Sequence, residues 1–69
     1  YKIEIDVEFA KKYLYMTMIE QYAIIDRMTE VSVKDNEIYI KYDMDNEIKE
    51  ISFEGGFDLL REWKLKDYK

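Results

Sequence analysis

The sequence predicts a single small α+β domain, residues 1–69, in which a three- or four-stranded, mostly antiparallel sheet packs on one long helix. Apolar residues recur at helical spacing across residues 7–28. Elsewhere apolar and polar residues alternate in short runs, which is the period of a half-buried strand. A second, shorter helical pattern follows a Gly-Gly pair near the end of the chain. The expected order of elements is therefore β-α-β-β-β-α.

The first strand and the long helix are expected to follow each other directly. Residues 1–5 alternate between large apolar and charged side chains. In the helix expected over residues 7–28, the Asp6 carboxylate can accept amide protons of the first turn. Neither glycine nor proline interrupts this run. Its main apolar stripe, which we expect to face the core, contains Val7, Ala10, Leu14, Met18, Ile25 and Met28.

Three further strands are expected, one beginning at Val31 and two over residues 38–44 and 48–53. Asp35-Asn36 and Asp45-Asn46 separate them, and both residue types tolerate the left-handed conformations of tight hairpins. Each pair begins the same tetrapeptide, Asp-Asn-Glu-Ile, which predicts two similar turns. Because the long helix and the second strand should run in opposite directions, we expect the first two strands to be parallel.

A short helix is expected to close the domain. The Gly55-Gly56 pair ends the strand pattern, and residues 58–67 carry helical spacing with Asp58 as the cap. Trp63 lies on the apolar side of this helix. We expect its ring to be largely buried and to join the last helix to the long one.

Composition and charge exclude several classes of protein. The net charge is −5, from 16 acidic and 11 basic residues, which opposes binding to phosphate backbones. The chain has no Cys and no His, so it lacks thiolate ligands, the commonest general base and the commonest zinc ligand. No apolar run is long enough to span a membrane. We therefore expect a non-enzymatic cytoplasmic protein, without metal or cofactor and without a membrane partner.

One acidic segment has the spacing of four ligands in a calcium-binding EF-hand loop: Asp43, Asp45, Glu47 and Glu54. Ile48 replaces the glycine that the sharp turn of such a loop requires, and the flanking residues have strand periodicity instead of helical spacing. We interpret this segment as an acidic hairpin turn.

A second, weaker apolar stripe on the long helix is the candidate partner surface. It contains Phe9, Tyr13, Met16, Ile19 and Ala23. The simpler interpretation is that another part of the same chain covers it. The functional interpretation is a protein–protein interaction module that acts as a regulator, inhibitor or accessory subunit. Small acidic domains without chemistry-bearing residues are typical of phage and mobile-element proteins.

The alternative function is nucleic-acid binding through the outer face of the sheet. Lys34, Tyr39 and Lys41 can share that face, where an aromatic ring beside cations could stack single-stranded bases. Acidic residues of the same strands oppose this. The simpler interpretation is cross-strand pairing of Tyr with Lys on a solvent-exposed face.

Self-association is also expected, as a two-fold dimer. A helix over residues 7–28 would be about 33 Å long, whereas a seven-residue strand spans only about 23 Å. Apolar side chains at both helix ends would then overhang the sheet, and a second copy commonly buries such surface. In the alternative, the sheet curls, loops cover the ends and the chain stays a monomer.

Overall fold

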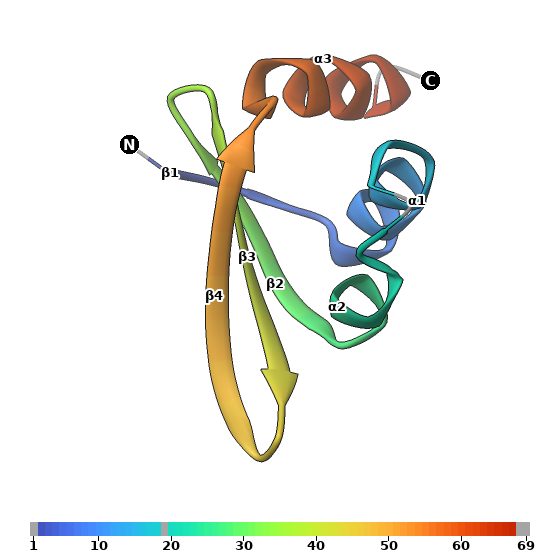
Figure 1. Ribbon diagram of the computed structural model, residues 1–69. Helices are drawn as coiled ribbons and strands as arrows, with labels where there is room; N and C mark the ends of the chain where they lie inside the picture. Colours follow the sequence, from blue (N-terminus) through green and yellow to red (C-terminus); the bar gives the residue numbers. More distant parts are fainter. Residues whose placement is uncertain (1, 19, 68–69) are drawn as a thin grey trace.

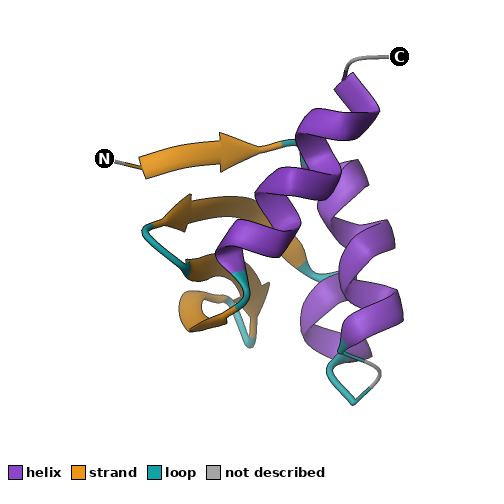
Figure 2. Ribbon diagram, turned by 90° about the horizontal axis from the view of Figure 1, so that it is seen from above, coloured by secondary structure: helices purple, strands orange, loops and turns teal. Residues whose placement is uncertain are grey.

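The fold is an α+β domain built on a four-stranded antiparallel sheet (Figure 1), which confirms the predicted class. The computed structural model describes residues 2–18 and 20–67. Strands follow one another in space as they do along the chain: β1 (Lys2–Ile5), β2 (Met28–Lys34), β3 (Glu37–Met44) and β4 (Glu47–Glu54). The helices lie together on one side of this sheet (Figure 2).

The first two strands are neighbours and run antiparallel, so the expectation that they run in the same direction is wrong. Ile3 lies opposite Val33, and Ile5 lies opposite Val31. The chain therefore returns to the sheet beside the point where it left. A single helix between the strands would deliver it to the far end instead, so the connection must contain one extra reversal.

That reversal is a break in the expected long helix. In the described residues, the connection contains α1 (Val7–Thr17) and α2 (Tyr22–Asp26) instead of one helix over residues 7–28. Met18 and Gln21 have non-helical φ angles of −125° and −117°. The amide of Gln21 donates to the carbonyl oxygen of Met18 at 3.0 Å and helps to close the turn.

Packing of the core explains the break. Ile25 on α2 is 0% exposed, as are Ala10 and Leu14 on α1. A straight helix would carry Ile25 past the end of α1 and away from the sheet, whereas the turn folds it back onto the core. The burial of one large aliphatic side chain contributes about 1.5–3 kcal/mol, which is enough to outweigh the helix propensity of a few intervening residues.

The start of α1 agrees with the prediction, but its length does not. The Asp6 carboxylate accepts the amide proton of Phe9 at 3.0 Å. With 11 residues, α1 is about 16 Å long, whereas the eight residues of β3 span about 26 Å. The helix is shorter than the sheet, so the overhang that motivated the dimer is absent from α1. Self-association itself stays a prediction.

The core lies between the helices and the inner face of the sheet. Its buried apolar residues are Ile5, Ala10, Leu14, Ile25, Met28, Val31, Val33, Ile38, Ile40, Tyr42 and Leu59. Trp63 packs against this cluster but is only half-buried, so the expectation of a largely buried ring is met in part.

The two Asp-Asn turns differ despite their identical tetrapeptides. Asp45 and Asn46 both have positive φ, 58° and 63°, as a primed hairpin turn requires. In the first turn only Asp35 has positive φ, at 57°. Asn36 is instead engaged with the start of the last helix, and this contact explains the different conformation.

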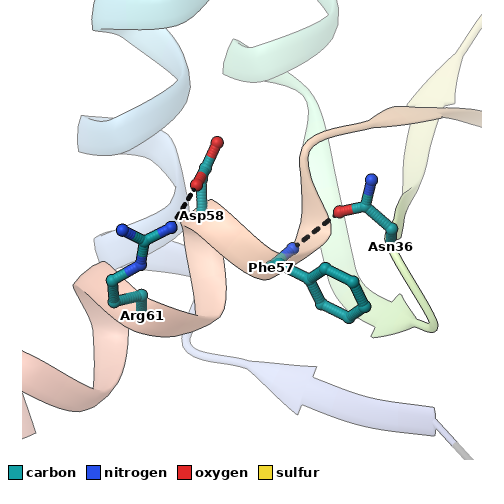
Figure 3. A network of polar contacts seen from close by, with 4 residues as sticks. All are labelled: Asn36, Phe57, Asp58 and Arg61. Atoms are coloured by element: carbon teal, nitrogen blue, oxygen red, sulfur yellow. Dashed lines mark hydrogen bonds and ion pairs between the residues drawn. The ribbon is translucent and has the colours of Figure 1, made fainter.

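The last helix, α3 (Gly56–Asp67), begins against the β2–β3 turn. The side-chain oxygen of Asn36 accepts the amide proton of Phe57 at 3.1 Å (Figure 3). Asp58, the expected cap, instead accepts a hydrogen bond from Arg61 at 2.6 Å on the helix surface (Figure 3). The predicted cap is therefore wrong, because a distant turn supplies the acceptor.

Replacing Asn36 with alanine is expected to lower the free energy of unfolding by about 0.5–2 kcal/mol, because the amide of Phe57 loses its acceptor. Asn36→Asp is the matched control, since a carboxylate keeps the acceptor and suits a helix N-terminus. Urea denaturation measures both variants. An equal loss in the two would show that the turn, and not the cap, is the source of the effect.

Candidate functional site

Met16, the most exposed large apolar side chain of the described residues, lies on the surface where α1 meets α2. We call this surface, formed by Tyr15, Met16, Tyr22 and Ala23, the helical corner. Met16 is 78% exposed and Tyr22 is 48% exposed. The rings of Tyr15 and Tyr22 meet edge to face, with centroids 5.3 Å apart. The Tyr15 hydroxyl also donates to Asp26, so two contacts join α1 and α2 at the residue that precedes Met16.

The break between α1 and α2 divides the predicted partner surface. Met16 and Ala23 are exposed at the helical corner. Phe9 and Tyr13 are half-buried and pack against the core cluster. Ile19 lies outside the described residues. The five positions therefore do not form one continuous stripe, because their helical spacing ends at Thr17.

The chain itself covers the inner part of that stripe. The pKa of Tyr13 is raised above its ordinary value of 10.0, first by burial and then by the negative charges of Asp58 and Glu62. Both carboxylates belong to α3, so this phenol lies beside the last helix. The simpler sequence interpretation, coverage by the same chain, holds for this half of the surface.

Two half-buried tyrosines also hold their protons more tightly in the folded chain. The pKa of Tyr15 is raised chiefly by its hydrogen bond to Asp26. The pKa of Tyr39 is raised chiefly by the hydrogen bond that its hydroxyl donates to Glu37 at 2.9 Å. Since both values lie above that of the unfolded chain, these bonds stabilise the fold fully below pH 10.0.

We expect the free energy of unfolding to fall as the pH rises through the raised pKa values of these two tyrosines, because folding then requires protons that the unfolded chain has lost. Urea denaturation at a series of pH values, with tyrosinate absorbance followed in parallel, measures the loss. The double variant Tyr15→Phe, Tyr39→Phe should be less stable at neutral pH and show a smaller loss at high pH. If the free energy of unfolding of the double variant falls with pH as steeply as that of the parent, the result contradicts the two hydrogen bonds.

The predicted nucleic-acid residues do share the outer face of the sheet. Tyr39 and Lys41 lie on β3, and Lys34 ends β2. Two of the three are engaged by carboxylates of the same face. The hydroxyl of Tyr39 donates to Glu37, and the Lys41 ammonium lies 3.4 Å from Glu30.

A shallow hollow of about 240 Å³ opens on this outer face, lined by Lys2, Lys34, Tyr39 and Glu50. The sequence alone does not place Lys2 in this hollow, because its position opposite Lys34 depends on the register of β1 with β2. The strand pairings put these charged residues on the outer face: Lys2, Lys34 and Lys41, and Glu4, Glu30, Glu37, Asp43, Glu50 and Glu54. Carboxylates outnumber lysines there, which opposes a phosphate backbone.

The edge of the sheet at β4 was not found by sequence reasoning. Ile48 is 73% exposed on the outer face. On the inner face Ile51 and Phe53 are only half-buried, whereas their partners on β3 are fully buried. The helices rest mainly on β2 and β3, which explains the difference. A signal was present in the sequence: Ile48 is out of phase with Ile51 and Phe53, so a strand must expose one or the other.

The described residues show no group placed to hold a metal ion and no membrane-spanning helix. The acidic residues with calcium-loop spacing lie along the β3–β4 hairpin, and the described residues contain no group of three acidic side chains placed to hold a metal ion. None of the helices in the described part of the chain is both long and apolar enough to cross a membrane.

Comparison with known proteins adds no functional assignment. No protein-family model, curated protein or solved structure matches this chain.

Proposed function

We propose that this chain is a small non-enzymatic protein–protein interaction module, a regulator, inhibitor or accessory subunit, that contacts its partner through the helical corner. The observation that carries the proposal is the 78% exposure of Met16 on a surface whose aromatic neighbours are held in place. Methionine and tyrosine are enriched at protein interfaces. When a partner covers a large apolar side chain, the free energy falls by about 25 cal/mol per Å² of apolar surface removed from water.

The contacts around Met16 favour binding with a small loss of conformational entropy. The Tyr15 hydroxyl donates to Asp26 and the Tyr15 ring meets that of Tyr22 edge to face, so neither ring needs to be ordered by the partner. Preorganised aromatic side chains improve affinity for this reason. The flexible Met16 side chain can then adapt to the shape of the partner's surface.

Capture from the native host, followed by mass spectrometry, tests the proposal. We expect a protein that the parent chain retains and that Met16→Asp releases, with affinity lower by about tenfold or more. Lys34→Ala is the control, because Lys34 is exposed on the outer face of the sheet, away from the helices. A partner retained equally by Met16→Asp would exclude the helical corner. The absence of any specifically retained protein would contradict the proposed module.

The same samples test nucleic-acid binding through the outer face of the sheet. The excess of carboxylates there argues against it, so labelled single- and double-stranded DNA and RNA should not bind at low salt. Salt-sensitive binding that Lys34→Ala weakens and Met16→Asp leaves unchanged would replace the proposed function with the alternative.

A further inference from the structure

We infer that the β4 edge, the open side of residues 47–54, docks an extended basic segment of another polypeptide as a fifth strand of the sheet. The inference rests on the proposed function in one respect, that the ligand is a polypeptide. It concerns a different surface from the helical corner, and Figure 1 shows the β3–β4 hairpin projecting away from α1 and α2.

The backbone of β4 offers hydrogen-bonding groups on its open side. In the described sheet, β4 has β3 as its neighbour on one side only. Antiparallel pairs alternate between bonded and non-bonded, and across a two-residue turn the closing pair, Met44 and Glu47, is bonded. The alternate residues then direct their N–H and C=O groups outward: Ile48, Glu50, Ser52 and Glu54.

The β4 edge carries only one of the usual protections against strand addition, an inward-pointing charge at Lys49. Natural edges are commonly blocked by proline, by a bulge, by lysines or by charged residues that point inward. β4 contains no proline, and its register with β3 runs without a shift across all eight pairs. Its single lysine, Lys49, is half-buried on the inner face. A strand of eight residues is long enough to hold a partner strand by main-chain bonds.

Both faces of β4 would gain cover from an added strand. On the inner face, Ile51 and Phe53 are half-buried beside fully buried Ile40 and Ile38. Apolar side chains of a fifth strand would lie next to them and extend the core. On the outer face an added apolar residue would cover Ile48, which is 73% exposed.

Charge selects the kind of strand. Glu50 and Glu54 lie on the outer face of β4, with Asp43 beside Ile48 on β3. Opposite charges directly across a strand pair are stabilising and like charges are destabilising. A second copy of this chain carries a net charge of −5 and the same carboxylates, so its β4 edge is a poor partner. A segment with Lys or Arg opposite Glu50 and Glu54, four positions apart, fits.

The register defines a peptide probe. An antiparallel strand read against residues 54 to 48 needs basic residues opposite Glu54 and Glu50 and an acidic residue opposite Lys49. Threonine suits the position opposite Ser52, and valine suits the remaining three. The probe is the end-capped peptide Lys-Val-Thr-Val-Lys-Glu-Val. Its control is the charge-reversed peptide Glu-Val-Thr-Val-Glu-Lys-Val.

Titration of the isotope-labelled chain with each peptide, followed by NMR, tests the inference. We expect the basic peptide to bind about tenfold more tightly than the reversed one at low salt, with the largest shifts at the amides of Glu50 and Ser52. The double variant Glu50→Lys, Glu54→Lys should invert this preference. Ser52→Pro should abolish binding of both peptides, because it removes an outward N–H without removing a bond to β3.

Two variants keep the outcomes separate. Met16→Asp should bind the basic peptide as the parent does, so a failed capture experiment and a failed peptide titration contradict different proposals. No binding of the basic peptide at about millimolar concentration, or equal binding of both peptides, would overturn the inference. So would sedimentation equilibrium that shows a dimer dispersed by Ser52→Pro, since a second copy would then occupy the β4 edge.

Discussion

Replacing Leu14 with alanine is expected to lower the free energy of unfolding by about 2–5 kcal/mol. Leu14 is 0% exposed on α1 and belongs to the core cluster with Ile25 of α2. The substitution removes buried methyl groups, and the surrounding side chains can close the cavity only in part. Small domains have a total stability of about 5–15 kcal/mol, so this single change should remove a large share of it. Urea denaturation followed by circular dichroism measures the loss.

Met16→Ala is the matched control for Leu14→Ala, because it shortens a large side chain on the same helix. Met16 is 78% exposed, so its truncation should change the stability by about 0.5 kcal/mol or less. If the two variants lose equal stability, α1 does not face the sheet with the side that carries Leu14. Met18, which is half-buried at the end of α1, should give an intermediate loss.

Gly56→Ala is expected to destabilise the fold by about 1–3 kcal/mol, as overpacking of a closed site does. A Cβ atom at Gly56 would lie 2.7 Å from the Cγ1 atom of Val33 and 2.9 Å from the backbone carbon of Asn36. Neither neighbour can move freely. Val33 is 1% exposed in the core, and the carbonyl of Asn36 accepts the amides of Gly55 and Gly56 at 3.0 and 2.8 Å.

The effect of Gly56→Ala should be coupled to that of Asn36→Ala, because both act on the contact between the β2–β3 turn and α3. The double variant should lose less stability than the sum of the losses of the two single variants. Glu54→Ala, an exposed position just before the same junction, should be close to neutral. Parental stability of Gly56→Ala would show that α3 does not begin against the turn.

Local pattern predicted the strands and the start of α1 because their causes are local. Alternation between apolar and polar residues places the strands, and Asp6 caps α1 through a contact three residues away. The break between Met18 and Gln21 has no such local cause, since no glycine or proline occurs there. It follows from the need to turn Ile25 onto the core, which is a property of the assembled layers.

Contacts between distant segments account for the other errors. Asp58 satisfies the local rule for a helix cap. However, it pairs with Arg61 instead, and the side chain of Asn36, in the β2–β3 turn, accepts the amide proton of Phe57 at the start of α3. The same contact makes two identical tetrapeptides adopt different turns. Local sequence patterns assign the same conformation to identical tetrapeptides, because they contain no information about contacts between distant segments.

The exposure of the residues in the candidate surfaces could be predicted only in part, for the same reason. Met16 and Ala23 were assigned to a partner surface from helical spacing, and both are exposed. Phe9 and Tyr13 had the same spacing, but α3 and the core cover them. The β4 edge depends on which strands are neighbours, and alternation says nothing about strand order. It became visible only when the order β1-β2-β3-β4 was known.

The strand order also divides the sheet into pairings that differ in the length of chain between the paired strands. Two-residue turns join β2 to β3 and β3 to β4, so these pairings need little loop closure and can form early. β1 has four residues, and residues 6–27 separate it from β2, so this pairing requires a much longer loop to close. Its amide protons should therefore be the first of the sheet to exchange with solvent, and the meander of β2, β3 and β4 should open last.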